Sequence, residues 1–187
     1  RVLKKGIRFG NLVSNRRKLD AFKLQKKTLT KLLAKARYTE FGVKYNFEDA
    51  LSSILFDEGA AFYETYKKNL PIHDWWYRAV DGEKNITWPG RIKYFALSSG
   101  TSEAASKHIP VSKEMSKAIQ RTSIRLIMSL GKYKDLPDNL YEKGFLMLGG
   151  STDLNVHDTR MDGDLSGITA SQIPFWFRPF YKPGQRI

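Results

Sequence analysis

The segment from Ile92 to Pro110 constrains the fold more than any other part of the sequence. Ile92 to Leu97 is a short aromatic and apolar run, which predicts a buried β-strand. A polar loop of small residues follows from Ser98 to Ser106, and Lys107 to Pro110 return to an extended pattern. A strand that leads into a loop of hydroxyls and glycine, with a lysine beyond it, favours an anion-binding turn.

The loop carries the groups that a polyphosphate needs. Its backbone N–H groups and hydroxyls can donate hydrogen bonds, its glycine allows a close approach, and Lys107 adds a full positive charge. The candidate phosphate contacts are Ser98, Ser99, Gly100, Thr101 and Ser102. Neither GxxxxGK[ST] nor GxGxxG is present, so the segment is not a Walker loop or a dinucleotide fingerprint. From composition alone, an ordinary surface loop remains the alternative.

The region before this segment is predicted to be mainly helical. Apolar residues recur at helical spacing from Leu19 to about Arg37, and again after Asn46 as far as Leu55. Asn46 is expected to cap the second of these helices. Further helices are predicted over residues 60–68 and 73–80, and turns at Asp81-Gly82 and residues 88–90.

The region after the segment continues as an α/β pattern. Ser112 is expected to begin a helix that ends near Gly131, and its broad apolar face indicates packing on a sheet. Residues 145–148 predict a second buried strand. The stretch from Ser151 to Gly167 is polar and rich in glycine and aspartate, which predicts loops.

Charge is distributed unevenly along the chain. Residues 1–37 hold 13 of the 32 lysines and arginines and a single acid, Asp20, whereas the remainder is nearly neutral. A basic arm of this kind allows a nucleic-acid or anionic-surface binding module as an alternative function. The lysines alternate with an apolar helical stripe, as on an ordinary surface helix, and no nucleic-acid motif is present, so nucleic acid is not the expected partner.

Composition limits the class of protein. There is no cysteine, which excludes disulfides and thiolate chemistry and suits a reducing compartment. The sequence contains no apolar run of membrane-spanning length and no secretory signal pattern, so a cytoplasmic location is expected. The chain begins at Arg1 rather than Met and stops as an apolar segment begins, so we expect it to belong to a longer polypeptide.

The histidines, a group of aspartates and a basic stripe are interpreted without a catalytic role. The three histidines, His73, His108 and His157, are scattered without metal-ligand spacing and are expected to be non-catalytic. The acidic group in the second half lacks calcium-loop spacing and is expected to be a solvated loop. The stripe on the helix after the loop is expected to be mainly a solvated face. The acidic group comprises Asp153, Asp158, Asp162 and Asp164, and the stripe comprises Lys117, Arg121 and Arg125.

The extended segment resembles a known family. Residues 94–115, YFALSSGTSEAASKHIPVSKEM, are similar to the first signature of the acyl-adenylate-forming superfamily. They are most similar to the branch of acyl acid–amido synthetases named after auxin-responsive plant enzymes, including its bacterial relatives. Residues 32–42, 88–90 and 164–168 resemble other segments of that branch, so the resemblance covers most of the chain.

The resemblance implies a two-step ligase reaction. A carboxylic acid attacks the α-phosphorus of ATP, which is accompanied by Mg²⁺, and the amine of an amino acid then displaces AMP. In that scheme residues 98–102 hold the phosphates, Lys107 balances charge on the departing pyrophosphate, and no residue of this chain is assigned to bind metal. The family often has glycine where this chain has Ala104, which leaves a non-catalytic scaffold of the same fold as an alternative.

The sequence therefore predicts an incomplete α/β protein. Residues 1–90 are expected to form a mainly helical N-terminal part. Residues 91–187 are expected to hold the first strands and helix of an adenylate-forming-type nucleotide-binding domain that is truncated at its C-terminus. The fragment alone is expected to be inactive, because the remaining signatures of the family lie beyond it.

Overall fold

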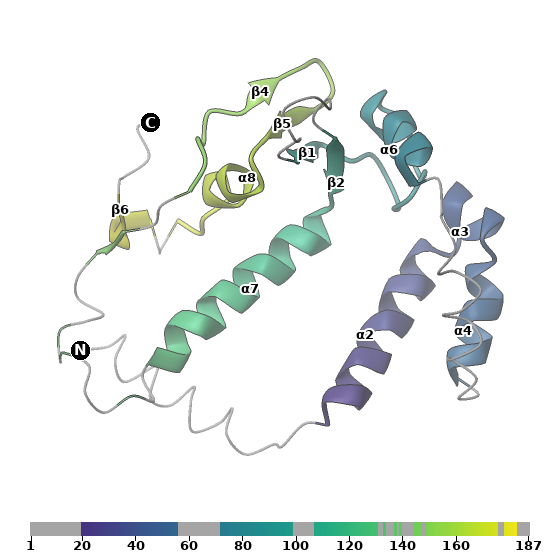
Figure 1. The fold of residues 1–187 in the computed structure, drawn as a ribbon, viewed down its shortest axis with the longest axis horizontal. Helices are drawn as coiled ribbons and strands as arrows, with labels where there is room; N and C mark the ends of the chain where they lie inside the picture. The colour runs from purple at the N-terminus through teal and green to yellow at the C-terminus, as the bar shows by residue number, and fades with distance from the viewer. Residues whose placement is uncertain are drawn as a thin grey trace. The chain divides into compact units, whose positions relative to one another are not determined.

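The computed structural model defines most of the helices and strands of the chain (Figure 1). The residues that it describes are 20–55, 72–98, 107–130, 133, 137, 139, 144–146, 149–175 and 178–182. They belong to two compact units. One unit comprises Leu19–Ser112 with Val156–Asp162, and the other comprises Arg1–Lys18, Lys113–Asn155 and Gly163–Ile187.

The first unit begins with a pair of packed helices. Helix α2 (Ala21–Ala36) is capped by Asp20, whose carboxylate accepts a hydrogen bond from the Phe22 N–H at 2.9 Å. Leu33 of α2 is buried against three apolar residues of helix α4 (Phe47–Leu55). This contact explains the helical spacing of apolar residues in both segments and confirms the two predicted helices. The three α4 residues are Ala50, Leu51 and Ile54.

Asn46 directly precedes α4, but it does not act as the predicted cap. It adopts a φ of 51°, and its side-chain amide donates a hydrogen bond to the carboxylate of Asp49. The predicted cap would instead accept a hydrogen bond from a backbone N–H of the first turn. The positive φ of Asn46 also departs from the extended backbone that an N-cap residue usually adopts.

A short helix between α2 and α4 was not predicted. Helix α3 (Glu40–Lys44) begins at Thr39, whose hydroxyl accepts a hydrogen bond from the Gly42 N–H at 3.0 Å and donates one to the Ala36 carbonyl at 2.6 Å. Gly42 is buried against the end of α2, and a Cβ at this position would lie 2.2 Å from the Ala36 carbonyl oxygen. The glycine therefore allows two backbones to meet, which is a packing role.

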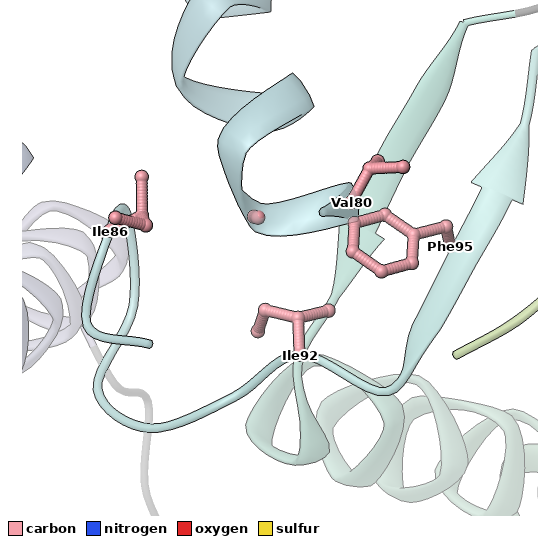
Figure 2. Close-up of a cluster of buried hydrophobic side chains, with 5 residues drawn as sticks. Val80, Ile86, Ile92 and Phe95 are labelled. Atoms are coloured by element: carbon pink, nitrogen blue, oxygen red, sulfur yellow. The ribbon is translucent and has the colours of Figure 1, made fainter. Parts of the chain in front are cut away.

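A second cluster joins helix α6 (Ile72–Val80) to the strands. Its buried side chains are Ala79, Val80, Ile86, Ile92 and Phe95, and Trp75 and Trp88 pack against it. Figure 2 shows Val80, at the end of α6, beside the ring of Phe95. The rings of Trp75 and Phe41 also pack edge to face, with centroids 5.4 Å apart.

The main sheet has the strand order β2-β1-β5-β4. Strands β1 (Tyr94–Leu97) and β2 (His108–Val111) are antiparallel, as the two extended segments predicted. Strand β5 (Met161–Gly163) joins β1 through a hydrogen bond from the Met161 N–H to the Lys93 carbonyl at 2.7 Å. Strand β4 (Asn155–Val156) completes the sheet. The loop predicted for residues 151–167 is therefore wrong at β4 and β5, because these short polar segments pair with neighbouring strands instead of burying an apolar face.

The second unit contains the long helix α7 and the short helix α8. Helix α7 (Lys113–Ser129) was predicted, and the side-chain amide of Gln120 donates a hydrogen bond to the carbonyl of Gln172, at the end of α8 (Leu165–Ser171), at 2.8 Å. Leu126, on the broad apolar face of α7, is 67% exposed. Strand β3 (Phe145–Leu146), which was also predicted, pairs in parallel with β6 (Tyr181–Lys182), and the 3-10 helix η3 (Arg178–Phe180) precedes β6.

These elements confirm the α/β class and the helical N-terminal part. The helix predicted over residues 60–68 lies outside the described residues, and so does Gly131, the expected end of the helix that follows Ser112. The domain division at residue 90 stays a prediction. None of the described helices combines the length and the apolar character that a membrane span requires.

The close approach at Gly42 gives the first prediction. Replacing Gly42 with alanine is expected to lower the free energy of unfolding by about 2 kcal/mol, because the new methyl group meets backbone atoms of α2. Val43→Ala, at the next position and 68% exposed, is the matched control and is expected to change it by less than about 0.5 kcal/mol. Denaturant unfolding of both variants measures the difference, and equal stabilities would contradict the packing role.

Candidate functional site

The hairpin formed by β1 and β2 brings two of the predicted site residues together. Leu97, the last residue of β1, pairs with His108, the first residue of β2. One position further along, the Ser98 N–H donates a hydrogen bond to the Lys107 carbonyl at 3.0 Å. The Lys107 N–H donates one to the Ser98 hydroxyl oxygen at 3.2 Å. Ser98 and Lys107 therefore form the closed base of the loop that connects the strands.

Ser98 and Lys107, the described residues of this site, both carry groups that can bind an anion. The Ser98 oxygen accepts from the Lys107 N–H, so its O–H proton is still available to a ligand. Lys107 is exposed, and among the described residues no acidic side chain forms a salt bridge with it. The other predicted contacts, Ser99, Gly100, Thr101 and Ser102, lie outside the described residues together with Ala104, so their roles stay predictions.

The hairpin is anchored by buried side chains of both strands. Phe95 and Ala96 of β1 are fully or almost fully buried, and so is Val111 at the far end of β2. Helix α6 packs against β2 and contributes Ala79 and Val80 to the apolar cluster that contains Phe95. This burial holds the strands in one register, and the register places Ser98 opposite Lys107.

A cluster of charged and titratable side chains lies beside the hairpin. Asp162 of β5 is buried, with only 7% of its side chain exposed. Its Oδ1 lies 2.6 Å from His157 Nε2 and 3.8 Å from Arg160 Nε, and its Oδ2 lies 3.8 Å from His108 Nε2. Asp162 Oδ1 has no hydrogen-bond partner among the described residues. Burial of a carboxylate is costly unless cationic or donor groups lie near it, and the nearest such groups here are Arg160 and the two histidines.

Sequence reasoning missed this cluster. The solvated-loop interpretation is wrong for Asp162, which is buried, whereas the interpretation of His108 and His157 as non-catalytic stays a prediction. The local signal was weak, because His108 is far from Asp162 in the chain and β5 is a short strand in a polar stretch. Met161 is exposed and Asp162 is buried, so no alternation of buried apolar and exposed polar residues marked β5 as a strand.

The segment Asp164–Ile168 has a structural explanation in the second unit. Asp164 caps α8 by accepting a hydrogen bond from the Ser166 N–H at 2.7 Å, and it also accepts one from the Ser166 hydroxyl at 2.5 Å. The Ser166 hydroxyl in turn accepts from the Gly150 N–H at 2.6 Å. A Cβ on Gly167 would lie 1.9 Å from the Ser151 carbonyl oxygen, so the glycine is needed for this contact. Asp164 is exposed and precedes the helix, as the solvated-loop interpretation expected, and it also has a structural role as the cap of α8.

The basic stripe on α7 is a solvated face, as predicted. Lys117, Arg121 and Arg125 are all exposed. Within the part of the chain that the structure describes, no group of three or more His, Cys, Asp or Glu side chains is arranged to hold a metal ion.

Comparison with known proteins supplies one match. Residues 15–172 match the family model described as the GH3 family N-terminal domain. A search of curated proteins returns no match.

The cap at Asp164 gives a prediction about pH. The hydrogen bonds from the Ser166 hydroxyl and then from its N–H lower the pKa of Asp164. A carboxylate with a lowered folded-state pKa stabilises the fold above its ordinary pKa, and this stabilisation is lost as the pH falls through the folded-state value. Asp164→Ala is expected to cost about 1 kcal/mol at neutral pH, and the cost is expected to shrink in acid.

Asp164→Asn is the matched control for this prediction. Asparagine still caps a helix, but it does not titrate, so this variant is expected to keep most of the stability without that pH dependence. Denaturant unfolding from pH 7 to pH 3 measures both effects. A difference between Asp164→Ala and the wild type that does not change with pH would contradict the assignment.

Proposed function

Because the chain belongs to the GH3 family, the family of auxin-responsive acyl acid–amido synthetases, we propose that the full-length protein is an ATP-dependent ligase. In this proposal it adenylates a carboxylic acid and transfers the acyl group to the amine of an amino acid. The observation that carries the proposal is the hairpin that joins Ser98 to Lys107 at the base of a hydroxyl-rich loop. A cytoplasmic location is part of the same proposal.

ATP is a substrate of this reaction. The carboxylate oxygen attacks the α-phosphorus, the bond to the β-phosphate oxygen breaks, and pyrophosphate leaves. The amine then attacks the acyl carbon, and AMP leaves with the oxygen that came from the acid. Both steps generate or displace negative charge, so they are accelerated by donors and cations that are already in position.

The described residues have the chemistry that the phosphates require. The Ser98 hydroxyl is free to donate a hydrogen bond, and the ammonium group of Lys107 is a compact charge suited to the departing pyrophosphate. In the proposal the N–H groups and hydroxyls of residues 99–102 complete the phosphate contacts. Mg²⁺ binds together with ATP, because this ion usually takes most of its ligands from phosphates and water.

Lys107 gives the direct prediction for this function. Lys107→Ala is expected to reduce carboxylate-dependent exchange of pyrophosphate into ATP by roughly 10² to 10³-fold, the usual loss when one positioned charge-stabilising group is removed. The full-length protein is assayed with a panel of carboxylic acids. Lys93→Ala is the matched control, because Lys93 is an exposed lysine just before β1 and is expected to leave exchange unchanged.

Other results would point to the alternative functions. Binding of ATP without exchange for any acid would favour a non-catalytic scaffold. DNA binding that weakens steeply with salt and disappears on removal of residues 1–37 would favour a nucleic-acid binding module. Equal exchange by Lys107→Ala and the wild type would contradict the role of Lys107.

A further inference from the structure

Asp162 lies where it can control the loop end of β2. It is on β5, whereas His108 is on β2, and β1 lies between these two strands in the sheet. The side chains of Asp162 and His108 therefore meet over the face of β1, with 3.8 Å between Oδ2 and Nε2. The carboxylate thus connects the outer strand of the hairpin to a strand that is not part of the hairpin.

The two ends of β2 are held in different ways. At its far end Val111 is buried, and α6 packs against the strand. At the loop end the described contacts of the His108 side chain are the carboxylate of Asp162 and the ring of Phe95, whose centroid is 6.5 Å from that of the imidazole. Loss of the carboxylate therefore weakens the loop end and leaves the far end anchored.

His108 is directly joined to Lys107, so the two Cα atoms are about 3.8 Å apart. Any shift of His108 along or away from β1 moves Lys107 and strains its two hydrogen bonds with Ser98. Arg160, in the turn between β4 and β5, also approaches the carboxylate of Asp162. Arg160 donates a hydrogen bond through Nη1 to the Val80 carbonyl at 3.3 Å.

We propose that Asp162 is a positioning residue for the candidate phosphate loop: by contacting His108 it fixes the loop end of β2 and, with it, Lys107. The effect on catalysis rests on the proposed adenylation function, whereas the effect on the hairpin does not. Asp162 itself does not touch the substrate in this account. Its carboxylate acts on Lys107 indirectly, through the imidazole of His108 and strand β2.

Three variants of the full-length protein separate this role from a general effect on folding. Asp162→Asn keeps the size of the side chain and removes its charge. His108→Gln removes the imidazole from β2 and serves as a second route to the same loss, because His108 is only partly buried. His157→Gln is the matched control, since it also loses a contact with Asp162 but lies on the β4–β5 hairpin.

Hydrogen–deuterium exchange of the Ser98 and Lys107 amides is the first measurement. In Asp162→Asn and His108→Gln both amides are expected to exchange roughly tenfold faster, and in His157→Gln they are expected to stay near the wild-type rate. The double variant Asp162→Asn/His108→Gln is expected to add nothing to either single change, because one contact is lost in each case. Ile54→Val, in the same unit but in the separate apolar cluster between α2 and α4, reports what a small loss of stability does by itself.

The Michaelis constant for ATP in pyrophosphate exchange is the second measurement. A misplaced Lys107 is expected to raise KM for ATP by roughly tenfold in Asp162→Asn and His108→Gln. A variant that only unfolds more readily loses active enzyme, which lowers the apparent kcat and leaves KM unchanged. A raised KM therefore distinguishes positioning from stability.

Each outcome bears on the proposal. Faster amide exchange with raised KM in Asp162→Asn and His108→Gln, but not in His157→Gln, supports it. Unchanged amide exchange, or equal effects of His157→Gln, overturns it. If the wild type shows no pyrophosphate exchange with any acid, the proposed function fails, and amide exchange alone still decides whether Asp162 positions the hairpin.

Discussion

The antiparallel pairing of β1 with β2 is the constraint on which the candidate site depends. Burial of Phe95 and Val111 fixes the register of the two strands, and the register places Ser98 opposite Lys107. Two hydrogen bonds then close the base of the loop. Because both ends of the loop are fixed before any ligand arrives, little ordering of its base has to accompany binding, which is the general advantage of a preorganised site.

Several residues that resemble the family pattern act by packing. Gly42 lets α3 meet the end of α2, and Gly167 lets α8 meet the backbone at Ser151. Asp164 caps α8 and binds Ser166, which in turn holds Gly150. These contacts are local and geometric, so they explain why such residue types occur there without assigning them a role in the chemistry. The proposed binding of the ATP phosphates therefore depends on the loop and on the residues that support it.

The sequence predicts the elements whose signals are local. Helical spacing locates α2, α4, α6 and α7, and a short apolar run locates β1, because these patterns follow from which face is buried. Strands β4 and β5 were missed because they are polar and are stabilised by pairing, β5 with β1 and β4 with β5. The Asp162 cluster was missed for the same reason, since only the sheet brings His108 and His157 to one carboxylate. The base of the loop was anticipated, because one strand, one loop and one lysine are consecutive in the chain.

The central claim is that a carboxylate attacks the α-phosphorus of ATP in the full-length protein. The most direct measurement uses a carboxylic acid labelled with ¹⁸O at both carboxylate oxygens, together with ATP, Mg²⁺ and hydroxylamine as the acyl acceptor, and determines by mass spectrometry where the label goes. Attack at the α-phosphorus predicts one ¹⁸O atom in AMP for each hydroxamate formed, because AMP leaves with an oxygen of the acid. Label in inorganic phosphate, or hydroxamate formation without labelled AMP, would contradict the account.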